Sequence, residues 1–253
     1  MAQALLLTRR RAIGVLAACA AGCGRPDRPG LTIAAAANLT DAFDRIGELF
    51  TRKTGIRLIY SYGSTAQLAQ QIENGAPFDG FAAADTEHID DLIREGSIVP
   101  ESRIVYARGR LALWSPRGEV RGIGDLAARA IRFIAIARPE AAPYGRAAVE
   151  SLRNSGVWDR VAPKLVYANN INAAKHYASS GSADAAFTAY SLVLHEPGRV
   201  LVVDESLHRP IDQAAGIVSA STRKAEARRF LSFLTESEGR STLERFGYQI
   251  PTK

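Results

Sequence analysis

The feature that most constrains the fold is an alternation of short apolar runs with amphipathic stretches of helical period, which begins at Leu31. Residues 31–36 form the first apolar run. Residues 40–53 follow as an amphipathic helix, and Gly55 stands where that helix should end. Alternating strands and helices are typical of α/β layers. We therefore predict an α/β protein with largely parallel sheet.

The alternation occurs in two successive units. The paired strands predicted at 104–108 and 111–115 mark the crossing from the first unit into the second. In the first unit we expect strands at 57–62 and 80–84 and helices at 66–74 and 86–95. In the second we expect strands at 132–137, 164–167 and 185–188 and helices at 145–154 and 171–180. Strands at 200–203 and 214–218 and helices at 222–236 and 237–246 should follow.

A chain that passes between two α/β units more than once would form two lobes around a hinged cleft. We expect the first lobe to comprise residues 31–109 and 213–253, and the second lobe residues 110–212. The total of 253 residues is enough for two lobes of ordinary size.

The first 23 residues are typical of a targeting segment. Residues 9–11 are three arginines, and residues 12–22 are apolar but too few to span a bilayer. The Thr8–Arg11 stretch is similar to a twin-arginine signal, although Ala12 replaces the usual Phe. Cys19 and Cys23 each follow small residues, as in bacterial lipoprotein cleavage sites. An ordinary cleaved signal peptide with incidental cysteines is the alternative. Residues 24–30 form a polar tether, and we expect a periplasmic protein, free or lipid-anchored.

Composition and motifs exclude several functions. Three of the net +6 charges belong to the arginines at 9–11, and no basic stripe with interleaved aromatics follows, so nucleic acid is not an expected partner. The sequence holds no phosphate loop, no Gly-x-Ser-x-Gly and no His-Glu-x-x-His. Both cysteines lie in the targeting segment, and the histidines at 88, 176, 195 and 208 are scattered, which suggests surface or boundary positions. We therefore expect no enzyme activity and no cofactor.

Four loops place small or polar residues immediately before a helix: residues 36–40, 62–66, 142–145 and 169–172. A helix start offers unpaired N–H groups and the positive end of the helix dipole, which favours anions. Each loop alone could be an ordinary helix cap. Because four such loops each follow a strand, and open α/β sheets bind ligands beyond the carboxyl ends of their strands, an anion site is the better interpretation.

The chain resembles the periplasmic molybdate-binding proteins of ABC importers over residues 31–251. The resemblance rests on an ordered set of motifs: Ala-Ala-Ala-Ala-Asn-Leu-Thr-Asp-Ala-Phe at 34–43, Gly-Ser-Thr-Ala-Gln-Leu-Ala at 63–69, Phe-Ala-Ala-Ala-Asp at 81–85, Leu-Trp-Ser at 113–115, Ala-Pro-Tyr-Gly at 142–145 and Gly-Tyr at 247–248. It implies a type II periplasmic-binding-protein fold, with two α/β lobes, a two-stranded hinge and the ligand in the cleft.

The resemblance also implies the ligand residues. They are Ala37, Asn38, Ser64, Thr65, Tyr144 and the backbone N–H of Ile171. Any contact with the metal would pass through the oxygens of molybdate, without direct coordination. Some family members add a tyrosine from a later loop. Ala189 stands at that position here, so the neighbouring Tyr190 is left out of the site.

The donor types agree with a fully ionised oxyanion. Molybdate, tungstate and sulfate are hydrogen-bond acceptors only, whereas phosphate, with a second pKa of about 6, often keeps a proton and needs an acceptor. The proposed ligand residues include no Asp or Glu, which disfavours phosphate. We expect a monomer that binds molybdate and tungstate and delivers them to the membrane permease of an ABC importer. The alternatives are a receptor for another oxyanion such as sulfate, or a sensory lipoprotein that does not transport.

Overall fold

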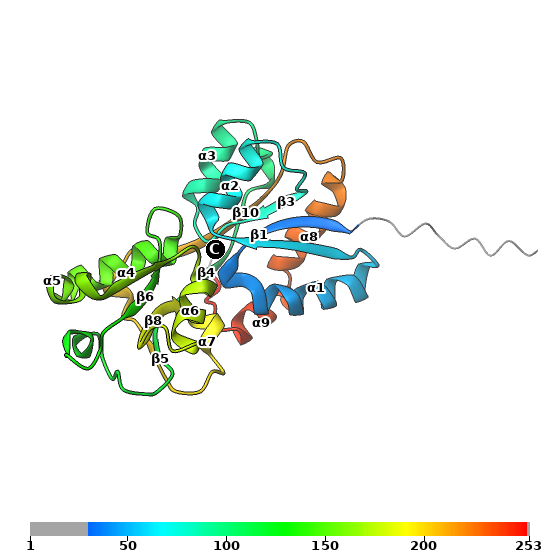
Figure 1. Ribbon diagram of the computed structural model, residues 1–253. Coiled ribbons are helices and arrows are strands. Elements are labelled where there is room, and N and C mark those ends of the chain that lie inside the picture. The colour runs from blue at the N-terminus through cyan, green and yellow to red at the C-terminus, as the bar shows by residue number, and fades with distance from the viewer. Residues whose placement is uncertain (1–29, 252–253) are drawn as a thin grey trace, which may run out of the picture.

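A computed structural model of the chain describes residues 30–251. The targeting segment with Cys19 and Cys23, and all of the tether except Gly30, lie outside the described residues. Within residues 30–251, no helix combines the length and the apolar character that a membrane span requires. The described chain forms two five-stranded sheets with helices on both faces of each (Figure 1).

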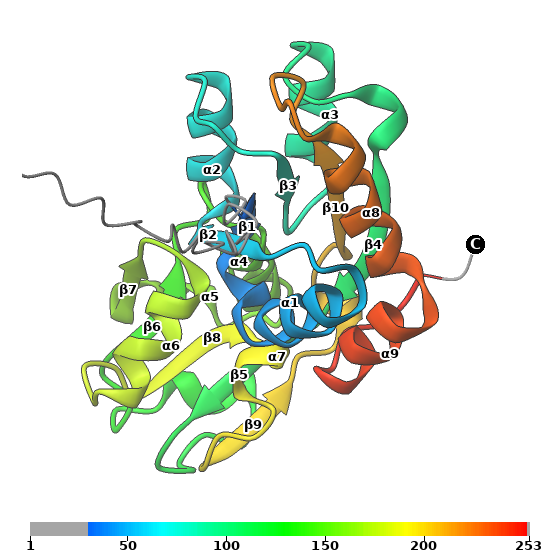
Figure 2. The ribbon, with the colours of Figure 1, turned by 90° about the vertical axis from the view of Figure 1, so that its right-hand side faces the viewer.

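The first sheet has the strand order β2-β1-β3-β10-β4. Its strands are β1 (Leu31–Ala36), β2 (Leu58–Gly63), β3 (Gly80–Ala82), β4 (Ile104–Gly109) and β10 (Ile211–Ile217). β1 is parallel to β2 and β3, whereas β10 runs antiparallel to both β3 and β4. Helices α2 (Thr65–Glu73) and α3 (Glu87–Arg94) cover one face, and α1 (Thr40–Thr54), α8 (Lys224–Thr235) and α9 (Ser237–Arg245) cover the other (Figure 2).

The second sheet has the order β7-β6-β8-β5-β9. Its strands are β5 (Leu111–Ser115), β6 (Ile134–Ala137), β7 (Leu165–Ala168), β8 (Ala185–Ala189) and β9 (Arg199–Val202). β6 is parallel to β7 and β8, and β5 is antiparallel to β8 and β9. Helices α4 (Pro143–Asn154) and α5 (Trp158–Val161) pack on one face and α6 (Ile171–Ser179) on the other, where the short α7 (Tyr190–Val193) follows β8.

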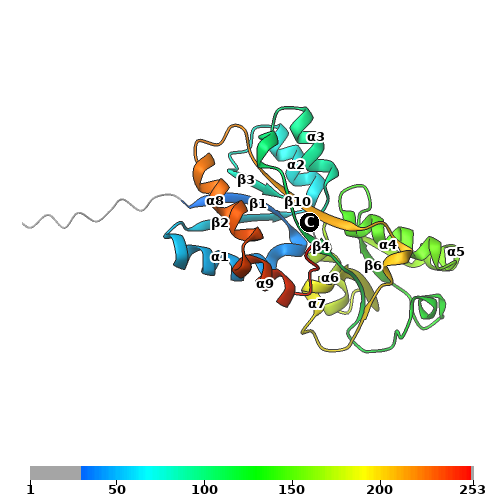
Figure 3. The same ribbon diagram turned by 180° about the vertical axis from the view of Figure 1, so that it is seen from behind.

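The chain passes between the sheets at two places that lie side by side (Figure 3). It leaves the first sheet after β4, passes through Arg110 and enters β5, and it returns between β9 and β10. β4 and β10 are paired up to the crossing, where Gly109 faces Ile211. The Arg108 guanidinium donates to both carboxylate oxygens of Asp212, at 2.6 and 2.9 Å. The two crossings are therefore tied together by backbone and side-chain bonds.

The structure corrects three details predicted from the sequence. The sheets are mixed and not largely parallel, because β10 runs antiparallel to both of its neighbours in the first sheet and β5 runs antiparallel to both of its neighbours in the second. The segments 104–108 and 111–115 are not paired with each other, since β4 pairs with β10 and β5 pairs with β8 and β9. The one-turn helices α5 and α7 went unpredicted, because four residues are too few to show a helical period.

Aromatic side chains join the C-terminal helices to the first sheet. Phe230 of α8 is fully buried and meets Phe43 and Phe50 of α1 edge-on, with ring centroids 5.8 and 5.6 Å apart. Tyr60 of β2 lies 6.4 Å from the same ring. Residues of the last helices thus complete a core that the first strand and helix begin, although about 190 residues of chain separate them.

We expect Phe230→Ala to lower the free energy of unfolding by about 3–5 kcal/mol, because it removes a ring that three aromatic neighbours enclose. Phe133→Ala is the matched control, since Phe133 is 47% exposed and should cost less than about 1 kcal/mol. Urea unfolding followed by circular dichroism measures both. Equal losses in the two variants would contradict this account of the core.

Candidate functional site

The four loops predicted from the sequence meet in one small cavity between the two sheets. Its volume is about 10 Å³, close to the space that one water molecule needs. The cavity is lined by Ala36, Ala37, Asn38, Gly63, Ser64, Thr65, Ala84, Ala142, Pro143, Tyr144 and Ile171. All six residues proposed from the sequence are in this set, and all six are buried. The structure therefore brings them together, while their role in binding an anion stays a prediction.

Sheet topology explains why these loops converge. Parallel strands in one sheet end at the same edge, so the residues that follow β1, β2 and β3 lie next to one another. Ala37 and Asn38 follow β1, Ser64 and Thr65 follow β2, and Ala84 follows β3. The second sheet contributes the first turns of α4 and α6 from the corresponding edge of β6 and β7. The strand ends of the two sheets thus face the same space.

The loop after β2 places two hydroxyl groups in the cavity lining. Ser64 caps α2, and its Oγ accepts from the Gln67 N–H at 3.4 Å. Thr65 Oγ1 accepts from the Ala84 N–H at 3.2 Å. A hydroxyl that accepts one bond still has its hydrogen to donate. The next amide, Ala66 N–H, donates across the cavity rim to Ala141 O at 3.2 Å.

The amide group of the Asn38 side chain donates within the protein. Its Nδ2 donates to Gln213 Oε1 at 3.1 Å and to Tyr248 Oη at 3.0 Å, so both hydrogens are used inside the protein. Its Oδ1 is buried and has no hydrogen-bond partner among the described residues. The Asn38 carbonyl accepts from Tyr248 Oη at 2.7 Å and from Ser191 Oγ at 3.0 Å. Asn38 is therefore a rigid part of the wall.

Tyr144 and Ile171 are the contributions of the second sheet's helices. Tyr144 lies in the first turn of α4 and is 1% exposed, and its Oη accepts from Gln213 Nε2 at 3.1 Å. Burial raises the pKa of the Tyr144 hydroxyl well above 10, and its hydrogen bonds lower it only in part, so it stays protonated. Ile171 opens α6, which Asn170 caps by accepting from the Ala173 N–H at 2.9 Å. Helix geometry leaves the first amide of α6 free of intrahelical bonds.

Sequence reasoning missed the polar residues behind the cavity wall. Gln213 of β10 is fully buried and bonds to both Asn38 and Tyr144, and Tyr106 of β4 bonds to Gln213 at 3.2 Å. Gln213 has a recognisable signal, since it is a long polar residue directly before three small or apolar ones, Ala-Ala-Gly. Tyr248 belongs to a motif that supported the family resemblance, but no role was given to it. Tyr190, left out of the site, does not line the cavity; the Arg110 guanidinium lies 4.8 Å from its ring.

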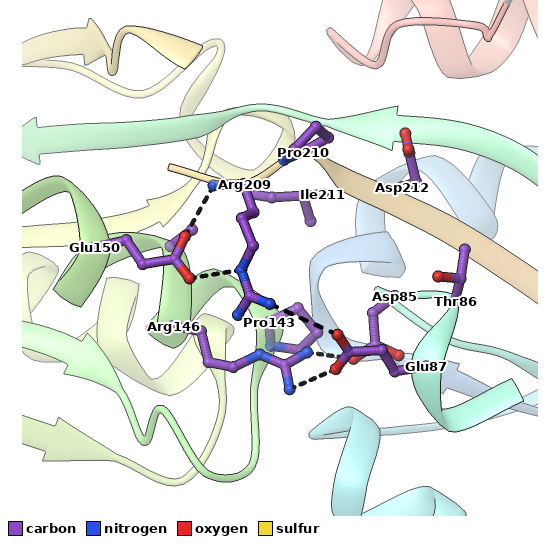
Figure 4. A pocket seen from close by; sticks show the side chains of 11 residues that line it. Asp85, Thr86, Glu87, Pro143, Arg146, Glu150, Arg209, Pro210, Ile211 and Asp212 are labelled. Carbon is purple, nitrogen blue, oxygen red and sulfur yellow. Dashed lines mark hydrogen bonds and ion pairs between the residues drawn. The ribbon is translucent and has the colours of Figure 1, made fainter. Parts of the chain in front are cut away.

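Beside the cavity, ion pairs join the α3 end of the first sheet to α4 of the second (Figure 4). Arg146 Nη2 lies 2.6 Å from Asp85 Oδ2, and Arg146 Nη1 lies 3.0 Å from Glu87 Oε2. Arg209 lies 3.9 Å from Glu87 and donates through Nε to Glu150 at 2.9 Å. The Asp85–Arg146 pair is the most enclosed of these, with side chains 10% and 30% exposed. The pairs with Asp85 and Glu87 cross between the two sheets, whereas Arg209 and Glu150 both belong to residues 110–212.

His88 completes this network from α3. Its Nδ1 lies 2.9 Å from Asp85 Oδ2, and that hydrogen bond raises the pKa of His88 above 6.5 against the opposing effect of burial. Burial is the largest single influence on Asp85 and acts to raise its pKa. The bonds from His88 and the charge of Arg146 together outweigh it and lower the pKa of Asp85. Asp85 is therefore held as a carboxylate.

The remaining histidines are not gathered into a metal site. Within residues 30–251 there is no cluster of three or more His, Cys, Asp or Glu side chains that could hold a metal ion. His176 and His195 are exposed, but His208 is 7% exposed, and its Nδ1 donates to Arg209 O at 2.8 Å. The expectation of a surface or boundary position was therefore wrong for His208.

Comparison with known proteins places this arrangement in a family. The model of the family described as bacterial extracellular solute-binding protein matches residues 31–249. This chain belongs to that solute-binding family. The molybdate-binding protein ModA of Rhodobacter capsulatus is 38% identical to this solute-binding protein over 230 residues, which cover 90% of this chain and 91% of the relative.

Solved structures agree with this assignment. The periplasmic molybdate-binding protein of Azotobacter vinelandii has a TM-score of 0.85 and 32% sequence identity, over 88% of this chain and all of that one. The sulfate-binding protein SubI of Mycobacterium tuberculosis shares the fold with a TM-score of 0.75 at 16% identity, over 87% and 86% of the chains. The resemblance to molybdate-binding proteins and the type II periplasmic-binding-protein fold are thereby confirmed.

We expect His88 to titrate above 6.5 in the folded protein and at a lower pH in the Asp85→Asn variant, where burial and the charge of Arg146 act without the opposing carboxylate. Because the folded pKa is raised, His88 adds stability below the unfolded value of 6.5 and loses it as pH rises through the folded value. NMR titration of the His88 ring gives both pKa values. A His88 pKa at or below 6.5 in the wild type, or an unchanged pKa in Asp85→Asn, would contradict the proposed contact.

Proposed function

We propose that this protein captures molybdate, and also tungstate, outside the cytoplasm and delivers it to the permease of an ABC importer. The observation that carries the proposal is the chemistry of the cavity lining. Its residues offer hydroxyl and backbone N–H donors, and no Asp, Glu, Lys or Arg is among them. Relatives named as molybdate-binding proteins, 38% and 34% identical to this chain, support the choice of ligand.

Neutral donors are sufficient to bind a dianion. A hydrogen bond to a charged group is roughly twice as strong as one between neutral groups. The N-termini of α2, α4 and α6 also point their first turns at the cavity, and helix dipoles place partial positive charge there. Because the lining holds no carboxylate, a ligand that keeps a proton finds no anionic acceptor. This favours fully ionised tetrahedral anions over phosphate.

Cavity size supports a binding mechanism that involves opening. A space of about 10 Å³ holds about one water molecule, so the loops must separate to admit a tetrahedral oxyanion. We assign residues 31–109 and 213–253 to one lobe and residues 110–212 to the other, with β4 and β10 at the hinge. Each lobe supplies part of the donor shell. The ligand therefore favours a closed arrangement by its higher affinity for it.

We expect the purified mature domain to be stabilised by molybdate and tungstate, by about 2.7 kcal/mol at 100 times the dissociation constant. Ser64→Ala and Tyr144→Phe should each weaken binding about tenfold to a hundredfold, because each loses a hydrogen bond to a charged group. Ile171→Val is the matched control, since only the backbone of Ile171 is used, and it should bind like the wild type. Calorimetry measures all three.

Parallel titrations with sulfate and phosphate test the choice of ligand. Tighter binding of sulfate than of molybdate would show that the ligand is another oxyanion, and no binding of any of the four anions would reject the proposed oxyanion receptor. Wild-type affinity in both Ser64→Ala and Tyr144→Phe would show that the ligand binds elsewhere.

We further propose that the protein is a periplasmic lipoprotein anchored through Cys23 or Cys19. Both residues lie outside the described part of the chain, so this proposal rests on the sequence alone. Replacing both cysteines with serine should move the protein from the membrane fraction to the soluble periplasmic fraction, because acylation needs the thiol. Single Cys19→Ser and Cys23→Ser variants identify the acylated residue. Unchanged fractionation of the double variant would reject the anchor.

A further inference from the structure

Gln213 is the one described side chain that hydrogen-bonds to cavity residues of both lobes. It accepts from Asn38 Nδ2 at 3.1 Å on one side and donates to Tyr144 Oη at 3.1 Å on the other. Its carboxamide is fully buried at the hinge, on strand β10. A buried amide that joins two halves of a binding site in this way is placed to control how they present their own hydrogen bonds.

A bulge in the hinge strands orients this group. Gln213 faces Ala107 and Ala214 faces Val105, so Tyr106 is an extra residue on β4. Such a bulge re-aims the side chains beside it. Here the Tyr106 hydroxyl reaches Gln213 Oε1 at 3.2 Å and also lies 3.2 Å from Ala83 O. Gln213 Oε1 therefore faces two groups that can donate to it, Asn38 Nδ2 and Tyr106 Oη.

The direction of the hydrogen bonds follows from Tyr248. Its hydroxyl makes its shortest bond, 2.7 Å, to the Asn38 carbonyl, which can only accept. With that hydrogen used, Tyr248 Oη faces Asn38 Nδ2 as an acceptor. Asn38 must then present Nδ2 to Gln213 as well, so Gln213 turns Oε1 toward Asn38 and Nε2 toward Tyr144. Tyr144 Oη thus accepts inside the protein, and its hydrogen remains for the cavity.

We propose that Gln213 is a positioning residue that fixes Tyr144 as a hydrogen-bond donor, and that this polarity favours anions without a proton at that corner of the site. The inference rests on the proposed function and names a determinant of its specificity. Gly109 makes room for the contact, because a Cβ there would collide with Tyr144 Oη and lie 2.6 Å from Gln213 Nε2.

Gln213→Glu and Gln213→Met separate polarity from packing. An ionised glutamate has the shape of glutamine but only accepts, so Tyr144 must give its hydrogen to residue 213 and turn its lone pairs to the anion. Methionine removes the hydrogen bonds and leaves the Tyr144 hydroxyl free to rotate. We expect a loss of molybdate affinity of about tenfold or less for Gln213→Met and about a hundredfold or more for ionised Gln213→Glu.

The pH profile supplies a readout that a purely structural role would not move. A protonated glutamate again donates to Tyr144 and accepts from Asn38, so its affinity should recover as pH falls. The titratable groups that face residue 213 are Tyr106 and Tyr144, with Tyr248 one bond further, and burial raises the pKa of all three. Asp85, His88 and Arg146 lie at the neighbouring rim. These three residues are present in the variant and in the wild type alike. The ratio of their dissociation constants therefore reports the effect of residue 213 alone.

Calorimetry with molybdate from about pH 5.5 to 9 measures this ratio, and thermal unfolding without ligand checks that each variant folds. A ratio for Gln213→Glu that rises with pH, and a flat ratio for Gln213→Met, would support the proposal. In a Tyr144→Phe background the Gln213→Met loss should disappear, since the two residues act as one pair. A ratio for Gln213→Glu that is flat with pH, or an undiminished Gln213→Met loss in that background, overturns it. If the wild type binds no molybdate, the proposed function fails first.

Discussion

The pairing of β4 with β10 is the constraint on which the rest of the structure depends. These neighbouring strands carry both crossings between the sheets, and the Arg108–Asp212 ion pair holds them together at that point. Two bodies joined along one line can rotate about that line more easily than they can slide. Opening and closing is therefore the motion that the proposed function requires of the two sheets. The strand ends that face each other beside this line form the cavity that we propose for the ligand.

Enclosure explains why the cavity wall is small and neutral. Ala37, Ala84 and Ala142 let backbone approach closely, while the charged groups stand at the rim, where Arg146 reaches Asp85 and Glu87. An ion buried at the centre would cost several kcal/mol of desolvation that a neutral donor avoids. At the rim, partly exposed charges can pair across the opening and separate again when the sheets part. A cavity with a neutral lining and charged residues at its rim therefore suits lobes that close and open reversibly.

Much of the fold and of the cavity lining could be predicted from the sequence, because both depend on patterns of neighbouring residues. Strand–helix alternation and the loops before helices depend on neighbouring residues, and all six proposed residues line one cavity. The mixed sheets could not be predicted in this way, since the direction of β10 depends on where the chain re-enters. The same limit applies to Gln213 and Tyr248, which reach Asn38 from 175 and 210 residues away. Hydrogen bonds between residues so far apart produce no periodic pattern in the sequence. The only signal is Gln213 itself, a polar residue directly before Ala-Ala-Gly.

Tyr248 orients Asn38 but lies near the end of the described chain. The ring closes on Asn38, near the start of the described chain, while the neighbouring Gln249 pairs with Arg108 beside the crossing. Domains generally fold as units, and the sheet that begins with β1 also contains β10. The loop that holds Asn38 is therefore synthesised long before the residue that orients it. A nascent chain released or cleaved ahead of residue 248 would hold most of the fold yet lack the group that orients Asn38. The orientation of Asn38 thus depends on one of the last residues that the structure describes.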